Sequence, residues 1–224
     1  MNKETSDTLQ LIEWGVAARA LGGRAESGDQ YLVEPFPGGV LVAVVDGLGH
    51  GPRAATVAKA TIAALEGYVQ EPVALLIAHC HEKLKRTRGV VMSLASFNAP
   101  DGTMTWLGVG NVTGFLLHAD AKAGRGREAL VTRGGVVGYQ LPTPRAAVIP
   151  VSRGDTLIFA TDGLRSGFVE GLTLDDPPQQ IAERIFAQHG RGTDDALVLV
   201  ARYVGTNDTS KASETSKVEN GETQ

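Results

Sequence analysis

The sequence of 224 residues has little cysteine and few aromatic side chains: Cys80 is the one cysteine, and aromatic residues make up 5% of the chain. A single cysteine excludes an internal disulfide and a cysteine-rich zinc site. No apolar run reaches the roughly 18 residues that would span a membrane, and the polar opening segment MNKETSDTLQ does not resemble a signal peptide. We therefore expect a cytoplasmic protein that does not cross a membrane.

The chain also lacks an excess of positive charge. It has 25 acidic and 21 basic residues, and its formal net charge is −4. This balance argues against a protein that holds nucleic acid mainly through its phosphates, so we expect no nucleic-acid partner. Glycine, in contrast, is abundant at 28 residues, and we expect these glycines at tight turns and close backbone approaches.

The length fits one domain with a sizeable core. The last segment, residues 206–224, contains no large apolar residue except Val218, so it cannot bury enough surface to offset the entropy of ordering. We predict one domain over residues 1–205, followed by a disordered tail over residues 206–224.

Apolar patterning within the domain predicts more strands than helices. Two continuous apolar runs, Gly39–Val45 and Ala196–Val204, are typical of strands buried on both faces. Glycine and proline punctuate six further expected strands: Val90–Asn98, Thr103–Val109, Val112–His118, Glu128–Thr132, Arg145–Pro150 and Thr156–Thr161. Helices are expected over Arg53–Gln70, over Val73–Arg86 and from Pro177-Pro178 to Gln188. This order of elements predicts an α+β sandwich.

Carboxylates at the ends of three apolar strands are the most informative feature of the sequence. Asp46 follows the first strand, Asp162 follows the strand that ends at Thr161, and Asp194-Asp195 precedes the last strand. Carboxylates drawn together by buried strands are unfavourable unless cations neutralise them, and such oxygen ligands suit magnesium or manganese. An Asp-Gly pair is also a common hairpin turn, and the spacing alone leaves open whether the three strand ends converge.

Other catalytic residue types are not arranged for a site. His79 and His81 lie on different faces of their predicted helix, and we expect no ligand-like partner for His118 or His189. Cys80 falls in the middle of the same helix, which argues against a cysteine nucleophile. Neither zinc nor a cysteine-based mechanism is therefore expected.

Four short motifs carry a resemblance to a known family: GDQY (28–31), VVDGLGHG (44–51), FATDGL (159–164) and TDDALVLV (193–200). In this order and spacing, over about residues 8–204, they resemble the PPM, or type 2C, metal-dependent serine/threonine phosphatases. They are most similar to the bacterial SpoIIE-like branch, where a histidine in the DGxGHG turn is typical. The resemblance implies a four-layer α-β-β-α sandwich of two mostly antiparallel sheets flanked by helices. The metal site would lie at one edge of the paired sheets.

The same resemblance implies a ligand set for two divalent ions, manganese or magnesium. Asp46 would bridge the two ions, and Gly47 would offer its backbone carbonyl to one of them. Asp162 and Asp194 would hold the other, and Asp29 would support the second through water. Paired ions about 4 Å apart activate a water for in-line attack on phosphorus.

Arg24 and His50 are further candidates whose roles stay open. Arg24 lies five residues before Asp29, as the family's phosphate-binding arginine does, but many bacterial relatives lack that residue and a surface role is equally open. His50 either protonates the leaving oxygen or serves only in packing. Asp195 takes the place of Asp194 if the register is shifted by one residue.

Two departures from the family pattern change the expected site. Many members have Gly-Asp where this chain has Gly110-Asn111, and the loss of that carboxylate should weaken a third metal site. The segment from Asp162 to Pro177 is short, so the flap subdomain of larger relatives is expected to be small or absent. The resulting open site suits a folded phosphoprotein.

Lone domains of this branch imply the substrate class. They include a feedback phosphatase of the stressosome, which implies phosphorylated STAS-domain proteins of a bacterial stress-signalling complex as partners. We expect the chain to act on them as a monomer. Two alternatives remain: a pseudophosphatase that grips the same partners without catalysis, and a nucleotide cradle at residues 47–51, whose spacing matches neither common phosphate-binding motif.

Overall fold

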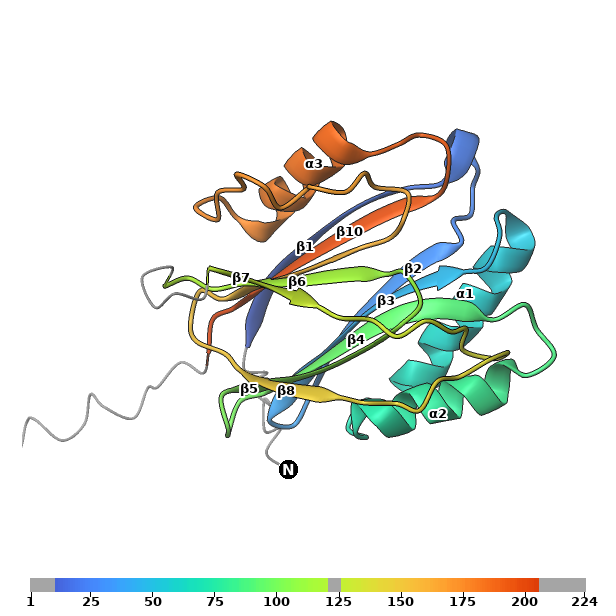
Figure 1. The fold of residues 1–224 in the computed structure, drawn as a ribbon, viewed down its shortest axis with the longest axis horizontal. Helices are drawn as coiled ribbons and strands as arrows, with labels where there is room; N and C mark the ends of the chain where they lie inside the picture. Colours follow the sequence, from blue (N-terminus) through green and yellow to red (C-terminus); the bar gives the residue numbers. More distant parts are fainter. Residues whose placement is uncertain (1–10, 121–125, 206–224) are drawn as a thin grey trace, which may run out of the picture.

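The computed structural model describes residues 11–120 and 126–205 of the chain. Within these ranges, two five-stranded antiparallel sheets pack face to face (Figure 1). The predicted tail over residues 206–224 lies outside the described residues, as do residues 1–10 of the predicted domain.

The two sheets have related strand orders. Sheet A has the order β1-β10-β9-β6-β7, with bounds β1 Ile12–Arg19, β10 Ala196–Tyr203, β9 Thr156–Ala160, β6 Thr113–Leu117 and β7 Arg127–Leu130. Sheet B has the order β2-β3-β4-β5-β8, with bounds β2 Asp29–Phe36, β3 Gly39–Gly47, β4 Val90–Asn98, β5 Thr103–Val109 and β8 Ala147–Pro150. Each sheet therefore has a four-residue strand, β7 or β8, at one edge.

Helices cover the outer face of each sheet (Figure 1). Helices α1 (Pro52–Glu66) and α2 (Val73–Leu84) pack on sheet B, and α3 (Pro178–His189) packs on sheet A. A short 3-10 turn, η1 (Leu21–Gly23), follows β1. The predicted four-layer α-β-β-α sandwich is confirmed. No helix in the described ranges is both long and apolar enough to cross a membrane.

Alternate residues of the central strands fill different layers of the core. In β3, Val42 and Val44 face the cluster between the two sheets, whereas Leu41 and Val45 face the cluster beneath α1 and α2. Strand β10 divides its residues in the same way between the central cluster and the cluster beneath α3. Because both faces are buried, these strands are continuously apolar rather than alternating.

The structure corrects the expected strands at the N-terminal side, where the sequence analysis assigned none before residue 39. Strands β1 and β2 both lie at a sheet edge, and β2 includes Pro35, a residue tolerated only at such an edge. In β1, a side chain at Gly15 would meet the α3 backbone at Gln179 within 2.3 Å. These half-exposed strands lack the apolar run that indicates a central strand.

Several expected elements are shorter in the structure. The helix expected to reach Gln70 ends at Glu66, before Gly67, and the second helix ends at Leu84 rather than at Arg86. The described residues between Asp162 and α3 form no helix or strand, only turns, irregular segments and an isolated bridge between Leu164 and Gly190. In that segment Phe168 and Val169 are buried in the cluster beneath α3. The expectation of a small or absent flap is therefore confirmed.

Candidate metal centre

The acidic strand ends meet at one edge of the sandwich. Asp29 and Asp46 are register partners across β2 and β3 of sheet B. Asp162 lies two residues after the end of β9, and Asp194 lies two residues before β10, its neighbour in sheet A. The charges of Asp162, Asp194 and Asp195 all act on Asp29 and Asp46. We call these five residues the acidic edge.

Thr161 joins the two sheets at the acidic edge. Its Oγ1 donates a hydrogen bond to Oδ2 of Asp29 at 2.7 Å, and it accepts one from the backbone N–H of Leu197 at 2.9 Å. Asp29 belongs to sheet B and Leu197 to sheet A, so this buried threonine locks the relative position of the carboxylates. The sequence analysis did not single out Thr161, although it precedes Asp162 in the FATDGL motif.

Asp194 and Asp195 have different environments. Asp195 is 4% exposed, and its two carboxylate oxygens accept hydrogen bonds from the backbone N–H groups of Leu21 and Gly28, each at 2.7 Å. Asp194 is exposed, and its carboxylate accepts one bond, from the N–H of Asp195. Asp195 therefore fastens the segment before β2, and Asp194 presents its carboxylate outward.

Close backbone approaches at the acidic edge require glycine at two positions. A side chain on Gly163 would lie 2.0 Å from the carbonyl oxygen of Asp195. A side chain on Gly47 would lie 2.4 Å from the carbonyl oxygen of Ala54 in α1. These contacts let the Asp162 turn approach the Asp194-Asp195 segment, and they let α1 pack directly behind the end of β3.

Burial and mutual repulsion of the carboxylates shift two pKa values at the acidic edge. Burial, opposed by the Thr161 hydrogen bond and reinforced by neighbouring carboxylates, raises the pKa of Asp29 to about 7. Burial and then the charge of Asp29 and the other carboxylates raise the pKa of Asp46 to about 8. No described residue donates a hydrogen bond to the Asp46 carboxylate. A divalent cation would remove both the repulsion and the cost of burying the charge.

Asn111, which stands where many family members have an aspartate, lies beside Asp162. Its side-chain amide donates a hydrogen bond to Oδ2 of Asp162 at 2.9 Å. An aspartate at this position would place a second carboxylate against Asp162. The amide therefore supplies a donor where other members of the family place a negative charge.

Two arginines contact the turn between β3 and α1. A terminal nitrogen of Arg88 donates to the carbonyl of Leu48 at 3.0 Å, and a terminal nitrogen of Arg24 lies 3.1 Å from Nδ1 of His50. Gly49 and Gly51 give this turn its positive φ angles of 88° and 78°. The structure thus places Arg24 and His50 together next to the acidic edge, while Arg88 was not anticipated from sequence.

The donor chemistry of the acidic edge fits hard divalent cations, although its side chains do not form a complete ligand set as they stand. Over residues 11–120 and 126–205, no three acidic, histidine or cysteine side chains lie close enough together to hold a metal ion. Thr161 holds one oxygen of Asp29 and Asn111 holds one of Asp162. The Asp46 carboxylate accepts no hydrogen bond from a described residue, and the acidic edge offers carboxylate oxygens rather than histidine nitrogens. Magnesium and manganese prefer such oxygen ligands.

The other titratable candidates lie elsewhere. His118 was expected to have no ligand-like partner, and this was wrong: its Nδ1 lies 3.0 Å from Oδ2 of Asp155 and its Nε2 lies 3.2 Å from Oε1 of Glu128. The fold brings these residues together from three strands or strand ends. Burial in α2 raises the pKa of the Cys80 thiol to about 12, so it is not a nucleophile at neutral pH.

Comparisons with known proteins place the chain among phosphatase domains. Residues 37–204 match the family described as Stage II sporulation protein E (SpoIIE). A curated relative, phosphoserine phosphatase RsbX of Bacillus subtilis (strain 168), is 32% identical over 97 residues, which are 43% of this chain. The match spans about half of that relative, 48% of its length.

Solved structures share the fold over most of the chain. One, from work on the bacterial stressosome as a modular system adapted to control secondary messenger signalling, has a TM-score of 0.77 and 30% identity; the match covers 85% of this chain and 99% of that one. Another, RsbX in complex with magnesium, has a TM-score of 0.75 and 21% identity; the match covers 86% of this chain and 95% of that one.

Proposed function

Because this chain belongs to the SpoIIE family of PP2C-type phosphatase domains, we propose that it hydrolyses phosphoserine and phosphothreonine on proteins with two divalent metal ions, manganese or magnesium. The observation that carries this proposal is the acidic edge, where Asp46 has no hydrogen-bond donor among the described residues and the charges of the other four carboxylates act on it. A protein that used this edge only for stability would be expected to satisfy that carboxylate with its own donors.

The proposed ligand assignment is the one that the family resemblance implies. Asp46 would bridge the two ions, and the backbone carbonyl of Gly47 would add a ligand to one of them. Asp162 and Asp194 would hold the other ion, and Asp29 would support the second through water. The exposure of Asp194, against the burial of Asp195 on two backbone donors, supports Asp194 rather than Asp195 as the ligand.

The ions supply an activated water and neutralise phosphoryl oxygens when they are bound. The chain's own residues then position the phosphoprotein. Arg24 is exposed and next to the acidic edge, where its guanidinium is placed to pair with phosphoryl oxygens. No covalent attachment of phosphate to the protein is required.

The contact between Arg24 and His50 limits what the histidine can do. Arginine is only a hydrogen-bond donor, so Nδ1 of His50 accepts in this contact and the proton of the neutral ring is on Nε2. In this arrangement His50 orients Arg24, and the departing serine or threonine oxygen takes its proton from elsewhere.

The proposal also names a class of substrate, which the fold alone does not specify. The curated relative is named a phosphoserine phosphatase, and a structure of similar fold and 30% identity comes from work on the stressosome. With the family resemblance, this leads us to propose phosphorylated STAS-domain proteins of a bacterial stress-signalling complex as the substrates. We propose that the chain acts on them as a monomer in the cytoplasm.

A metal titration against a phosphorylated STAS-domain protein tests the proposal. Phosphate release should rise with manganese or magnesium and stop with a chelator, and Asp194→Asn should abolish release without changing the far-UV circular dichroism. Asp175→Asn, at an exposed position away from the acidic edge, is the matched control and should keep full activity. Binding of the phosphoprotein without any release across the titration would favour the pseudophosphatase alternative.

A further inference from the structure

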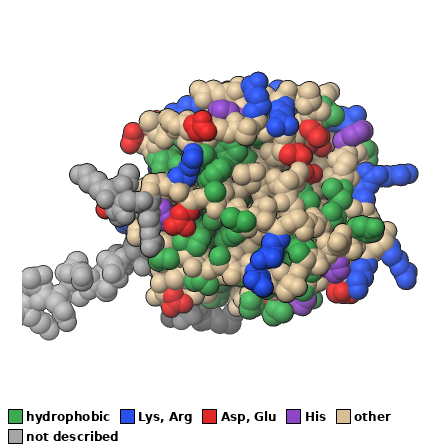
Figure 2. Space-filling view, viewed as in Figure 1, with side chains coloured by type: hydrophobic (Ala, Val, Ile, Leu, Met, Phe, Trp, Pro, Cys, Tyr) green, Lys and Arg blue, Asp and Glu red, His purple; other side chains and the backbone are tan. Residues whose placement is uncertain are grey.

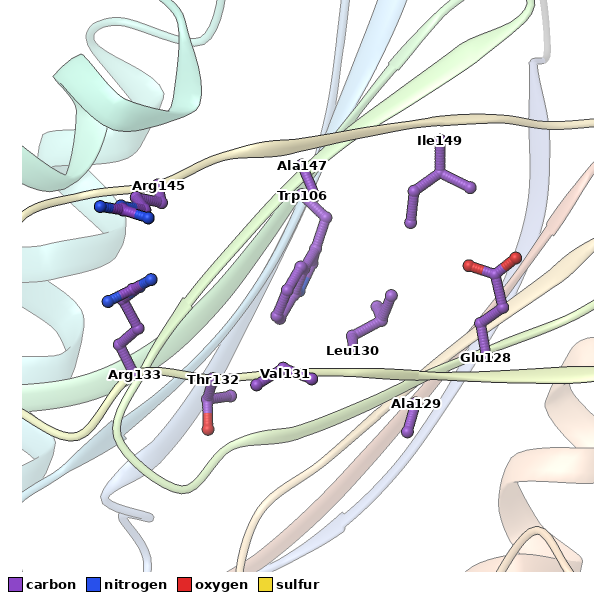
Figure 3. A pocket seen from close by; sticks show the side chains of 10 residues that line it. All are labelled: Trp106, Glu128, Ala129, Leu130, Val131, Thr132, Arg133, Arg145, Ala147 and Ile149. Carbon is purple, nitrogen blue, oxygen red and sulfur yellow. The ribbon is translucent and has the colours of Figure 1, made fainter.

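A groove of about 560 Å³ opens between the edge strands β7 and β8, and no residue of the acidic edge lines it. Figure 3 shows the side chains from the two strands facing each other across it, with Trp106 between them. The floor is apolar and includes Trp106, Leu130 and Ile149. On the face shown in Figure 2, hydrophobic side chains gather with Lys and Arg side chains beside them. We call this feature the β7–β8 groove.

The indole of Trp106 carries an unsatisfied donor at the floor of the β7–β8 groove. Its ring is 4% exposed, and its Nε1–H is buried without a hydrogen-bond partner among the described residues. A buried donor without an acceptor is unfavourable by about 1–3 kcal/mol. Because this donor is itself buried, Trp106 offers an occupant of the groove only the apolar surface of its ring.

The two ends of the β7–β8 groove differ in charge. At one end Arg133 and Arg145 face each other (Figure 3), and neither guanidinium has an ion-pair or hydrogen-bond partner within residues 11–120 and 126–205. At the other end Glu128 is paired with His118 at 3.2 Å. Two unpaired guanidinium groups favour a carboxylate-bearing occupant at the first end.

The walls of the groove suit an extended chain. Strands β7 and β8 are the last strands of their sheets among the described residues, so each has one side without a strand partner. Apolar side chains line both walls, with Val131 on one, at 79% exposure, and Ala147 and Ile149 on the other. A four-residue strand is about 13 Å long, and an extended segment of similar length can pair with such an edge.

The arginine end of the groove lies beside the acidic edge. The backbone N–H of Gly110 donates to the carbonyl of Arg133 at 2.8 Å, and the next residue, Asn111, bonds to Asp162. We infer that the β7–β8 groove binds an extended acidic segment of the phosphoprotein substrate, which flanks the phosphorylated residue. The identity of this segment as substrate rests on the proposed phosphatase function.

Trp106 itself can report occupation of the groove. The chain contains two tryptophans, and the other, Trp14, is 44% exposed at the far edge of sheet A. In the full-length Trp14→Phe variant, tryptophan emission comes from Trp106 alone. A short peptide of alternating valine and glutamate is the probe, and a peptide of alternating valine and lysine is its control.

We expect the glutamate peptide to change Trp106 emission saturably and the lysine peptide to have no effect. Arg133→Glu and Arg145→Glu, made singly in the Trp14→Phe background, should each weaken binding at least about tenfold. Lys83→Glu reverses the same charge at an exposed position of α2 and should leave binding unchanged. In the otherwise unaltered protein, Arg145→Glu should raise KM for the phosphoprotein and leave turnover of p-nitrophenyl phosphate unchanged.

Three results overturn the inference: no emission change with the glutamate peptide, an equal response to the lysine peptide, or unchanged affinity in both arginine variants. A dimer in sedimentation that blocks peptide binding would assign the groove to a second copy of the chain and also overturn it. Peptide binding without any phosphoester hydrolysis would refute the proposed function and leave the groove as an acidic-segment site. Hydrolysis without peptide binding would remove the groove assignment alone.

Discussion

Asp155 and Asp46 are both carboxylates at the end of an apolar strand, and the protein treats them in opposite ways. Asp155 precedes β9 and accepts hydrogen bonds from the backbone N–H groups of Ala119 and Ser152, with His118 at 3.0 Å. Asp46 lies near the end of β3 without a donor among the described residues. The comparison separates a carboxylate whose hydrogen bonds the fold supplies from one that has none, which is the carboxylate we propose as a metal ligand.

Removing the charge from each carboxylate should give the largest difference between the two regions. Asp46→Asn should lower kcat for metal-dependent phosphate release more than about a hundredfold, because it removes the proposed bridging ligand. The measurement is a steady-state assay at saturating manganese, with circular dichroism to verify the fold.

Asp155→Asn is the matched control for that substitution. It should lower the free energy of unfolding by about 1–3 kcal/mol, because an amide cannot accept all three bonds, and keep kcat within about twofold in the folded protein. Equal catalytic losses in the two variants would contradict the division of roles.

The pH dependence of stability should sharpen the comparison. Without metal, the pKa of Asp46 is about 8 in the folded protein against an ordinary value of 3.8, so between these values the folded state binds more protons than the unfolded state. Stability therefore falls as pH rises through this window. The side chain introduced by Asp46→Asn does not titrate. Without metal, the free energy of unfolding of this variant should therefore exceed that of the wild type by an amount that grows from pH 4 to pH 8, on the order of a few kcal/mol at pH 8.

Urea unfolding at a series of pH values, with chelator, measures this difference. Saturating manganese should reverse its sign, because the cation stabilises only the protein that retains the carboxylate. A difference that does not vary with pH would show that Asp46 keeps an ordinary pKa in the folded protein.

The smallest expected effect concerns Asn111. Asn111→Asp replaces an amide donor to Asp162 by a second exposed carboxylate, which should lower metal-free stability by about 0.5–1 kcal/mol. It should also add a weak metal-binding event in titration calorimetry. Asn111→Ala removes the donor without adding charge, so equal stability and equal metal stoichiometry in the two variants would rule out the electrostatic explanation.

The central strands and the helices could be predicted because burial and helix starts restrict the residue types at these positions. The apolar runs of β3 and β10 mark burial on both faces, and Pro52 marks the start of α1. The edge strands β1 and β2 are harder to recognise, because part of each is exposed to solvent. Strand β1 contains Gly15 and strand β2 contains Pro35, and neither residue type is typical of a central strand. The missed strands are therefore those in which burial constrains the residues least.

The candidate site was predicted in part for a similar reason. The Asp-Gly pairs next to apolar strands identified Asp46 and Asp162, and the motif order connected them with Asp29 and Asp194. The contacts of Thr161, Asn111 and Arg88 could not be predicted, because each joins residues that are far apart in the chain. The pairing of His118 with Asp155 and Glu128 was missed for the same cause.

The sequence by itself determined the layered fold class and the residue types at the acidic edge, because strand burial and carboxylate chemistry are local properties of the chain. Only the tertiary structure decided how those residues divide their work. It turned Asp195 inward onto two backbone donors and Asp194 outward, and it left Asp46 without a donor. The same packing opened a groove between β7 and β8, since hydrogen bonding and charge balance depend on which segments meet in space.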